Sequence, residues 1–213
     1  MTSIPADRPE LRFSRDIAAH EEAFFALEDI AMGKMNDLIY GGEVAGEVRD
    51  LLYGQGLADF GPPFAFLLLR EEEVMGLGSG LPARRAKELR LAGALALARA
   101  GTLRREPALA RWLRATAQTF FDLQEGDYYL SRVALFPAAQ GHGLGRILLD
   151  ELAEDARRQG CRRVIVETGP TYTKAIQVYE RLGYNQLGRA SAHDPERDVT
   201  LEVLHFGLDL AKS

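Results

Sequence analysis

The chain has little cysteine, and its few histidines are dispersed. The single cysteine, Cys161, excludes a disulfide within the chain, and such scarcity is typical of proteins from a reducing compartment. The four histidines, at positions 20, 142, 193 and 205, do not have the spacing of metal ligands, so we expect no metal site. We interpret Cys161 as a small buried hydrophobic residue at the start of a strand, in preference to a nucleophile.

The sequence also lacks long hydrophobic runs. The longest, at residues 64–69 and 91–98, are too short to cross a bilayer, which takes about 20 apolar residues. The first residues, MTSIPADRPELRF, have no apolar core of the kind that a secretory signal peptide carries. We therefore expect a cytoplasmic protein.

The chain also has fewer positively charged than negatively charged side chains. With 26 lysines and arginines against 31 aspartates and glutamates, the chain has a formal net charge of −5. This charge argues against non-specific binding of nucleic acids, and it is compatible with a cationic partner such as an amine. The length of 213 residues predicts one domain over residues 1–213, without a visible repeat or linker.

The most informative stretch is residues 128–160, in which a strand, a glycine-rich turn and a helix follow each other. Aromatic and branched residues fill positions 128–136, as in strands, and Pro137 ends the hydrogen-bonded ladder. Beyond the turn, apolar residues recur at every fourth position from Leu144 to Ala156, which predicts an amphipathic helix.

The turn at residues 140–145, QGHGLG, has a composition suited to binding phosphate. Amides at the start of a helix have no partner inside it and carry partial positive charge, and glycines let the backbone approach an anion. Two nucleotide-binding patterns do not fit: the dinucleotide fingerprint requires glycine where Arg146 stands, and the Gly-Lys-Ser/Thr of the Walker pattern is absent. By itself, the hexapeptide is better explained as an ordinary tight turn.

A second pattern further along changes this interpretation. Gln140, Gly143 and Gly145 form Q-x-x-G-x-G after a strand that ends in Leu-Phe-Pro. Residues 175–184, AIQVYERLGY, fit A-x-x-x-Y-x-x-x-G-[FY]. In this order and at this separation, the two patterns resemble motifs A and B of the GCN5-related N-acetyltransferases, and the resemblance covers about residues 127–187.

The resemblance implies an α/β acyl-CoA N-acyltransferase fold, in which helices flank a mixed, mostly antiparallel sheet. Residues 84–121 depart from that plan, because they form an insertion between the third and fourth strands where the family usually has a short link. Their many alanines, leucines and arginines predict two helices. We consider three roles for the insertion: packing against the sheet, a lid over the acceptor pocket, and a dimer surface.

The resemblance also implies that acetyl-CoA is the cosubstrate. In the family, a bulge in the fourth strand separates it from the fifth, and the pantetheine arm bonds to the exposed strand amides. The glycine-rich loop binds the pyrophosphate, and Tyr172, near motif B, stands where many members have asparagine. The residues expected to bind acetyl-CoA are Val133, Ala134, Leu135, Gln140, Gly141, His142, Gly143, Leu144, Gly145, Arg146, Tyr172, Lys174 and Ala175.

Two side chains are expected to take part in the chemistry. Tyr179 matches the family tyrosine that points at the cofactor sulfur, and a phenol with a pKa of about 10 can protonate a leaving thiolate while neutral at pH 7. Glu167 is the first candidate for the general base, directly or through water, because it ends a strand at the edge where ligands bind. Asp127 is the alternative, and either carboxylate could instead bind a cationic acceptor or make a structural hydrogen bond.

Other parts of the chain are expected to frame the acceptor. A helix over about residues 20–35 should bury Phe24 and Leu27 and turn Glu28 away from that face. By resemblance, the segment at residues 36–43 should border the acceptor site. A polar loop at residues 190–198 could reach the acceptor or be solvated.

Together these features predict acetyl transfer from acetyl-CoA to a primary amine, with a small molecule favoured as the acceptor. Two alternatives stay open: acetylation of a protein or peptide amine, and a CoA-binding module without turnover. We expect no nucleic-acid or membrane partner, whereas a homodimer is compatible with the insertion.

Overall fold

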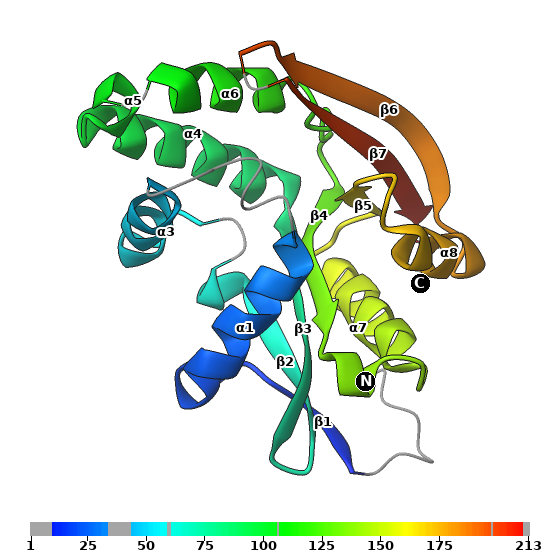
Figure 1. Ribbon diagram of the computed structural model, residues 1–213. Coiled ribbons are helices and arrows are strands. Elements are labelled where there is room, and N and C mark those ends of the chain that lie inside the picture. Colours follow the sequence, from blue (N-terminus) through cyan, green and yellow to red (C-terminus); the bar gives the residue numbers. More distant parts are fainter. Residues whose placement is uncertain (1–9, 34–43, 59–60, 106, 197, 211–213) are drawn as a thin grey trace.

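The computed structural model describes residues 10–33, 44–58, 61–105, 107–196 and 198–210. These residues form a seven-stranded sheet with strand order β1-β2-β3-β4-β5-β7-β6 (Figure 1). The pair β4–β5 is parallel and the other neighbouring pairs of described strands are antiparallel, which confirms the expected mixed sheet. The strands are β1 (Leu11–Ser14), β2 (Ala65–Arg70), β3 (Glu73–Pro82), β4 (Asp127–Leu135), β5 (Arg163–Thr168), β6 (Asn185–Asp194) and β7 (Val199–Asp209).

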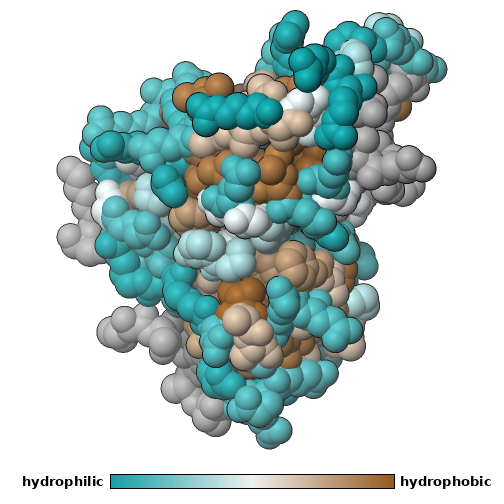
Figure 2. Space-filling model, turned by 90° about the vertical axis from the view of Figure 1, so that its left-hand side faces the viewer, coloured by the Kyte–Doolittle hydropathy of each residue, from teal (hydrophilic) through white to brown (hydrophobic). Residues whose placement is uncertain are grey.

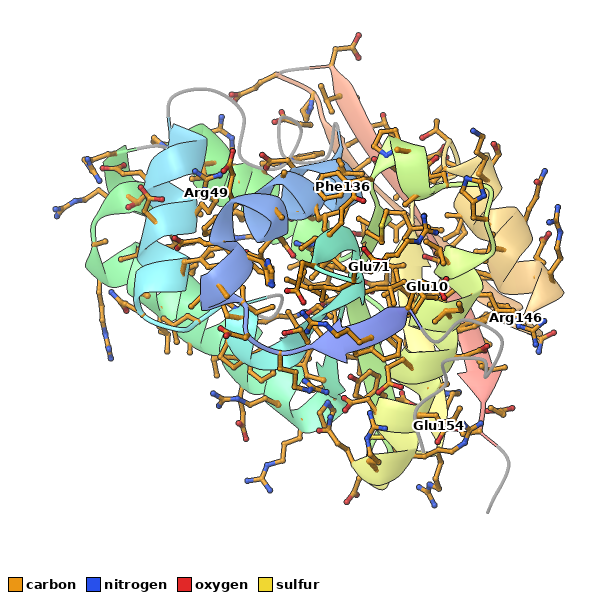
Figure 3. The ribbon with its side chains drawn as sticks, turned by 90° about the horizontal axis from the view of Figure 1, so that it is seen from below. Glu10, Arg49, Glu71, Phe136, Arg146 and Glu154 are labelled. Atoms are coloured by element: carbon orange, nitrogen blue, oxygen red, sulfur yellow. The ribbon has the colours of Figure 1, made fainter. Side chains whose placement is uncertain are left out.

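Helices cover both faces of this sheet. They are α1 (Glu21–Met32), α3 (Val44–Gly54), α4 (Ala83–Arg99), α5 (Thr102–Arg105), α6 (Pro107–Ala117), α7 (Leu144–Arg158) and α8 (Thr173–Arg181). Seen from below, α1 and α3 lie on one side of the sheet and α7 and α8 on the other (Figure 3). In β2, Leu67 packs toward α1 and Leu68 toward α7, so the strand is an unbroken hydrophobic run. No helix in the described ranges is long and apolar enough to cross a membrane.

The insertion between β3 and β4 reaches across to the far strands of the sheet (Figure 1). It contains α4, the single turn α5, and α6, so one short helix is added to the two that we expected. Gly101, with a φ of +75°, lets the chain turn after α4. Trp112 of α6 is 1% exposed and packs on Leu201 and Val203 of β7. The insertion therefore bridges from the end of β3 to β7.

The insertion is also held by α3. Leu52 of α3 shares a hydrophobic cluster with Leu97 of α4 and Leu109 of α6. Figure 2 shows the side of the molecule on the left of Figure 1, where hydrophobic side chains gather in the middle of the face between hydrophilic ones. Leu91 and Leu95 of α4 are exposed hydrophobic residues, at 64% and 48%. The helices of the insertion thus have one face packed and one face in solvent.

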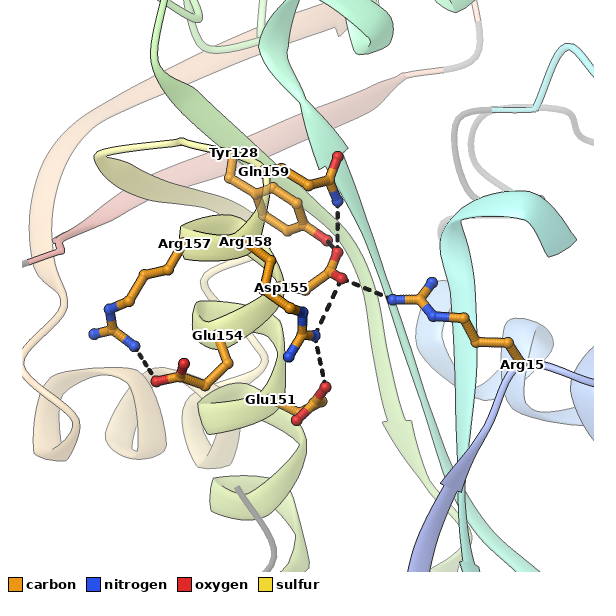
Figure 4. Close-up of polar contacts among 8 residues, drawn as sticks. All are labelled: Arg15, Tyr128, Glu151, Glu154, Asp155, Arg157, Arg158 and Gln159. Carbon is orange, nitrogen blue, oxygen red and sulfur yellow. Dashed lines mark hydrogen bonds and ion pairs between the residues drawn. The ribbon is translucent and has the colours of Figure 1, made fainter. Parts of the chain in front are cut away.

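A buried carboxylate fixes α7 against the sheet. Asp155 of α7 accepts hydrogen bonds of 2.7 Å from the Tyr128 hydroxyl, from Arg15 and from Gln159 (Figure 4). Arg158, one turn along the helix, lies 3.2 Å from the same carboxylate. Burial and the charge of Asp155 raise the pKa of Tyr128, so the phenol remains a donor. These contacts hold the helix that begins at the glycine-rich loop.

The last two strands are longer than the sequence suggested. We expected a polar loop at residues 190–198, but β6 continues to Asp194 and β7 begins at Val199. Ala192 and Asp194 are buried, and the Asp194 carboxylate accepts a hydrogen bond of 3.0 Å from the amide of Glu196. The loop prediction was therefore wrong for residues 190–194, because pairing with β7 overrides their polar character.

Candidate functional site

The two parallel strands of the sheet separate halfway along their length. β4 pairs with β5 from Asp127 to Leu130, where Leu130 lies opposite Val166, and beyond this point it pairs with β3 alone. A register shift against β3 leaves Ser131 as an extra residue in β4, and its hydroxyl bonds to Ser79 Oγ at 3.0 Å. The edge of β4 that faces β5 is thus without a strand partner after Leu130. The bulge and the opening between the strands were both expected.

The glycine-rich loop joins β4 to α7 and has an open surface. Gly141 and Gly143 have φ values of +83° and +78°, in the left-handed region that favours glycine. A Cβ added at either position would meet nothing within 4 Å, so the space above the loop is free. Gly143 is the N-cap residue of α7, and the amides of Leu144 and Gly145 follow in its first turn, where no acceptor exists within the helix. This is the geometry of an anion site.

The side chains of Gln140 and Arg146 contact residues outside the loop. The Gln140 side-chain amide donates a hydrogen bond of 3.3 Å to Leu135 O and ties the loop to the end of β4. Arg146 lies on the outer side of α7, 3.4 Å from Asp150 (Figure 3). His142 is exposed. The loop therefore presents mainly backbone groups to a ligand.

A cavity of about 520 Å³ occupies the opening between β4 and β5 and continues under the insertion. Five of the predicted site residues line it: Val133, Glu167, Tyr172, Ala175 and Tyr179. The other predicted residues, Ala134, Leu135, Lys174 and the loop at 140–146, lie outside its lining. The structure thus places both expected catalytic residues on the lining of one cavity, and this lining does not include the loop.

Tyr179 reaches the cavity from α8. Its side chain is 7% exposed, and its ring packs 5.5 Å from that of Tyr184 and 6.1 Å from that of Phe206. Burial raises the pKa of Tyr179 to about 12. The raised pKa keeps the phenol neutral at pH 7. Within the described residues its hydroxyl has no hydrogen-bond partner, so it is available as a donor. Tyr184 is buried in the core, as expected.

Glu167 lies at the cavity wall with both carboxylate oxygens engaged. Oε1 accepts a hydrogen bond of 2.5 Å from the amide of Phe121, and Oε2 accepts one of 2.9 Å from the Tyr129 hydroxyl. Arg90 of α4 is 3.7 Å from Oε2, and its guanidinium lies over the rings of Phe120 and Tyr129, at 4.2 and 4.4 Å. The carboxylate therefore connects the insertion to the end of β5. The sequence suggested the residue and gave no sign of these partners.

Asp127, the alternative base, lies at the opposite end of the strand pair. It begins β4 and does not line the cavity. Its oxygens lie 2.8 and 3.0 Å from the Arg163 guanidinium, and one of them accepts a hydrogen bond of 2.6 Å from the amide of Gln124. The hydrogen bonds that Arg163 donates to Asp127 raise the pKa of the guanidinium. This geometry corresponds to the structural alternative that we had left open.

A buried ion pair near the bulge was missed by the sequence analysis. Arg132 lines the cavity, and its Nε lies 3.3 Å from Glu28 Oε2 of α1, with the two side chains 12% and 7% exposed. The expectation that Glu28 faces away from the core was therefore wrong. Burial, followed by the charge of Glu28, raises the pKa of the Tyr53 hydroxyl of α3. One signal was present: Glu28 is four residues after Phe24, which places both on one face of a helix.

Tyr172 forms another wall of the cavity. It is the N-cap residue of α8, and its hydroxyl donates a hydrogen bond of 3.2 Å to Met32 O at the end of α1. A Cβ on the adjacent Gly33 would lie 2.6 Å from that hydroxyl, so glycine permits the contact. Lys174 is exposed in the first turn of α8, and Ala175 is half-buried behind it. The segment at residues 36–43, expected to border the acceptor, lies outside the described residues.

Comparison with known proteins agrees with this geometry. The mycothiol acetyltransferase of Rhodococcus erythropolis is 35% identical over 75 residues, which are 35% of this chain and 24% of that protein. The [ribosomal protein bS18]-alanine N-acetyltransferase of Escherichia coli is 28% identical over 82 residues, which are 38% of this chain and 55% of that protein. These alignments thus span about a quarter and about half of the two relatives.

Solved structures and a family model extend the similarity over more of the chain. The Salmonella typhimurium protein yncA, solved with its cofactor acetyl-CoA, has a TM-score of 0.57 and 18% identity over 95% of this chain and 94% of that chain. At this identity the similarity concerns the fold. The model of the acetyltransferase (GNAT) family matches residues 38–184, more than half of the chain. The chain therefore belongs to the acetyltransferase (GNAT) family.

Proposed function

We propose that the protein transfers the acetyl group of acetyl-CoA to a primary amine of a small molecule. One observation carries this proposal: β4 and β5 open beside a glycine-rich helix start, and the opening leads into a cavity that the insertion covers. Family membership supports the acetyl transfer, and the covered cavity supports the small acceptor.

The residues present fit acetyl-CoA. Above Gly141 and Gly143 the surface is open where a Cβ would stand, so a pyrophosphate can approach the amides at the start of α7. The unpartnered edge of β4, at Val133, Ala134 and Leu135, offers backbone groups to a pantetheine amide. Tyr172, Lys174 and Ala175 would complete the site at the start of α8. When bound, acetyl-CoA supplies an activated acetyl thioester.

Tyr179 is the proposed general acid. Its raised pKa of about 12 keeps the phenol protonated at neutral pH, and its hydroxyl stands at the cavity without another hydrogen-bond partner among the described residues. It can therefore give its proton to the thiolate that leaves when the amine nitrogen has bonded to the acetyl carbon.

Glu167 is the proposed acceptor of the amine proton. Since Tyr129 bonds to Oε2, the proton can reach the carboxylate through that hydroxyl or through a water. The contacts of Glu167 with Phe121 and Arg90 also support a structural role, as a clamp on the insertion. Substitution of Glu167 by glutamine separates the two roles.

Two alternatives are kept. Among similar proteins one is named for mycothiol and one for the alanine of a ribosomal protein, so a protein amine is the rival acceptor. A CoA-binding module without turnover is the other. The lone cysteine supports a cytoplasmic location, and the exposed Leu91 and Leu95 support a homodimer through the insertion.

The test is a screen of amines with acetyl-CoA in which the released thiol is followed. Cys161 does not disturb such an assay, because it is buried and burial raises the pKa of its thiol. Thiol release with a small amine, and none with peptides, is the expected result. Measurable CoA binding without release for any amine or peptide would support the non-catalytic module and reject the proposed reaction.

A further inference from the structure

The part of the cavity beyond the strand opening has apolar walls. We call this part the acceptor half. It lies between α3, α4, α6 and β7, and the insertion supplies much of its lining. The side chains that define it are Leu52, Leu57, Leu89, Leu97, Leu113 and Val203.

The charged residues of the cavity are matched in pairs. Arg90 lies 3.7 Å from Glu167, and Arg132 lies 3.3 Å from Glu28. A polyamine would need additional carboxylates for its further ammonium groups, and a sugar phosphate would need a cation without a carboxylate partner. Among the described lining residues, neither is present. The electrostatics of the cavity therefore favour a ligand with one amino group and no second charge.

We infer that the acceptor is a primary amine carried on an apolar body, such as an alkylamine or an arylalkylamine. This inference rests on the proposed acetyl transfer and names its substrate class. The body fills the acceptor half, while the amino group points toward Glu167 and Tyr179. Desolvation by the apolar walls lowers the pKa of the bound ammonium, so the amine is delivered in the neutral form that can attack the thioester.

The number of methylenes that an amine buries in the acceptor half sets the expected change in kcat/KM. Each additional methylene buried in the acceptor half should raise kcat/KM about fourfold. The increase ends when the amine chain fills the acceptor half of the 520 Å³ cavity. The series propylamine, butylamine, hexylamine and 4-phenylbutylamine is therefore expected to rise and then level off. Spermidine, glucosamine 6-phosphate and a peptide beginning with alanine should be at least about tenfold poorer than hexylamine.

A pair of substitutions on α4 tests the location. Ala94 and Ala98 are both exposed and lie one turn apart, but only Ala94 lines the cavity. Ala94→Leu should lower kcat/KM for 4-phenylbutylamine about tenfold and leave propylamine nearly unchanged. Ala98→Leu adds the same side chain to the same helix and should change neither value.

The outcomes separate this inference from the reaction on which it rests. Thiol release that is fastest with spermidine, glucosamine 6-phosphate or the peptide overturns the apolar acceptor and leaves acetyl transfer intact. Equal effects of Ala94→Leu and Ala98→Leu overturn the location. Binding of 4-phenylbutylamine to the CoA-saturated protein is measured by calorimetry in parallel. If no amine is turned over, saturable binding still supports the apolar site, and its absence overturns it.

Discussion

Tyr129 of β4 donates a hydrogen bond of 2.9 Å to Glu167 of β5. Tyr129 lies opposite Ile165, so Glu167, two residues further along, is its diagonal neighbour on the same face of the sheet. Because the strands separate beyond Val166, this contact lies at the point where the cavity opens. Arg90 of the insertion also contacts Glu167. The hydrogen bond therefore connects the last paired residues of β4 and β5 to the insertion.

The two roles of Glu167 can be separated by Glu167→Gln. The amide keeps the size of the side chain and one acceptor oxygen, but it cannot take a proton. If Glu167 receives the amine proton, kcat should fall by about 10²–10⁴-fold and the pH dependence of kcat should change. If it only clamps the insertion, the melting temperature should fall, by the equivalent of about 1–3 kcal/mol, with kcat preserved.

Asp127→Asn is the matched control for that experiment. It removes a buried carboxylate at the other end of the same strand pair, where Arg163 loses its partner. We expect a lower melting temperature and an unchanged pH profile. A loss of kcat in Asp127→Asn that exceeds the loss in Glu167→Gln would contradict the assignment.

Tyr179→Phe tests the general acid. The ring and its packing remain while the proton is lost, so kcat should fall by about 10²–10⁴-fold, and the Michaelis constant for acetyl-CoA should move little. A smaller loss would mean that water replaces the phenol. Tyr184→Phe is the control, since the Tyr184 hydroxyl is buried without a hydrogen-bond partner within the described residues. Its removal should leave kcat unchanged and stability equal or higher.

The raised pKa of Tyr179 allows a second test of its role as the general acid. The phenol has a pKa of about 12 in the folded protein and about 10 in the unfolded chain. This difference contributes to the free energy of unfolding, and the contribution is complete below pH 10. This contribution is lost as the pH rises from 10 to 12. Below pH 10, kcat should therefore show no decline caused by ionisation of Tyr179. A decline near pH 9 that disappears in Tyr179→Phe would disprove the raised pKa.

Gly143→Asp tests the phosphate loop. The position has room for a side chain, so the variant should fold, and a carboxylate there would repel the pyrophosphate. Calorimetry should show acetyl-CoA affinity reduced by about 10- to 100-fold. Gly143→Asn is nearly the same size and also tolerates a left-handed φ, so it isolates the charge. Affinities of both variants equal to that of the wild type would remove the loop from the binding site.

Trp112→Ala tests the attachment of the insertion to β7. The buried indole packs on Leu201 and Val203, and its loss should destabilise the protein by about 3–5 kcal/mol. Because α6 also borders the cavity, the Michaelis constant for the acceptor should rise more than that for acetyl-CoA. Leu91→Ala, at a residue 64% exposed, should cost less than about 0.5 kcal/mol. Unchanged acceptor kinetics in a folded Trp112→Ala protein would reduce the insertion to a packing element.

Local features of the fold could be predicted because the responsible residues are close in sequence. Pro137 and the glycines at 141 and 143 define the end of a strand and the start of a helix within a few residues, and the apolar repeat from Leu144 defines α7. The β2–β3 hairpin joins two apolar segments that are adjacent in the sequence. Tyr179 was proposed as the acid because residues 175–184 resemble motif B of the family.

Errors arose where contacts with another element, and not local composition, set the environment of a residue. Glu28 has a polar side chain on an amphipathic helix, yet it is buried because Arg132 lies above it. Residues 190–194 are polar, yet they form a strand because β7 offers a ladder of backbone hydrogen bonds. Neither partner can be found from local composition.

The sequence by itself determined the family, the strand–loop–helix that would hold the pyrophosphate, and the candidate acid, since spacing and backbone requirements are written into short motifs. Only the tertiary structure decided where the insertion goes, that Glu167 is engaged by Phe121, Tyr129 and Arg90, and that the cavity has apolar walls. The physical reason is that these properties depend on contacts between segments far apart in the chain, such as Tyr129 and Glu167, separated by 38 positions, and Phe121 and Glu167, separated by 46. The packing of the whole sheet and its helices selects those contacts.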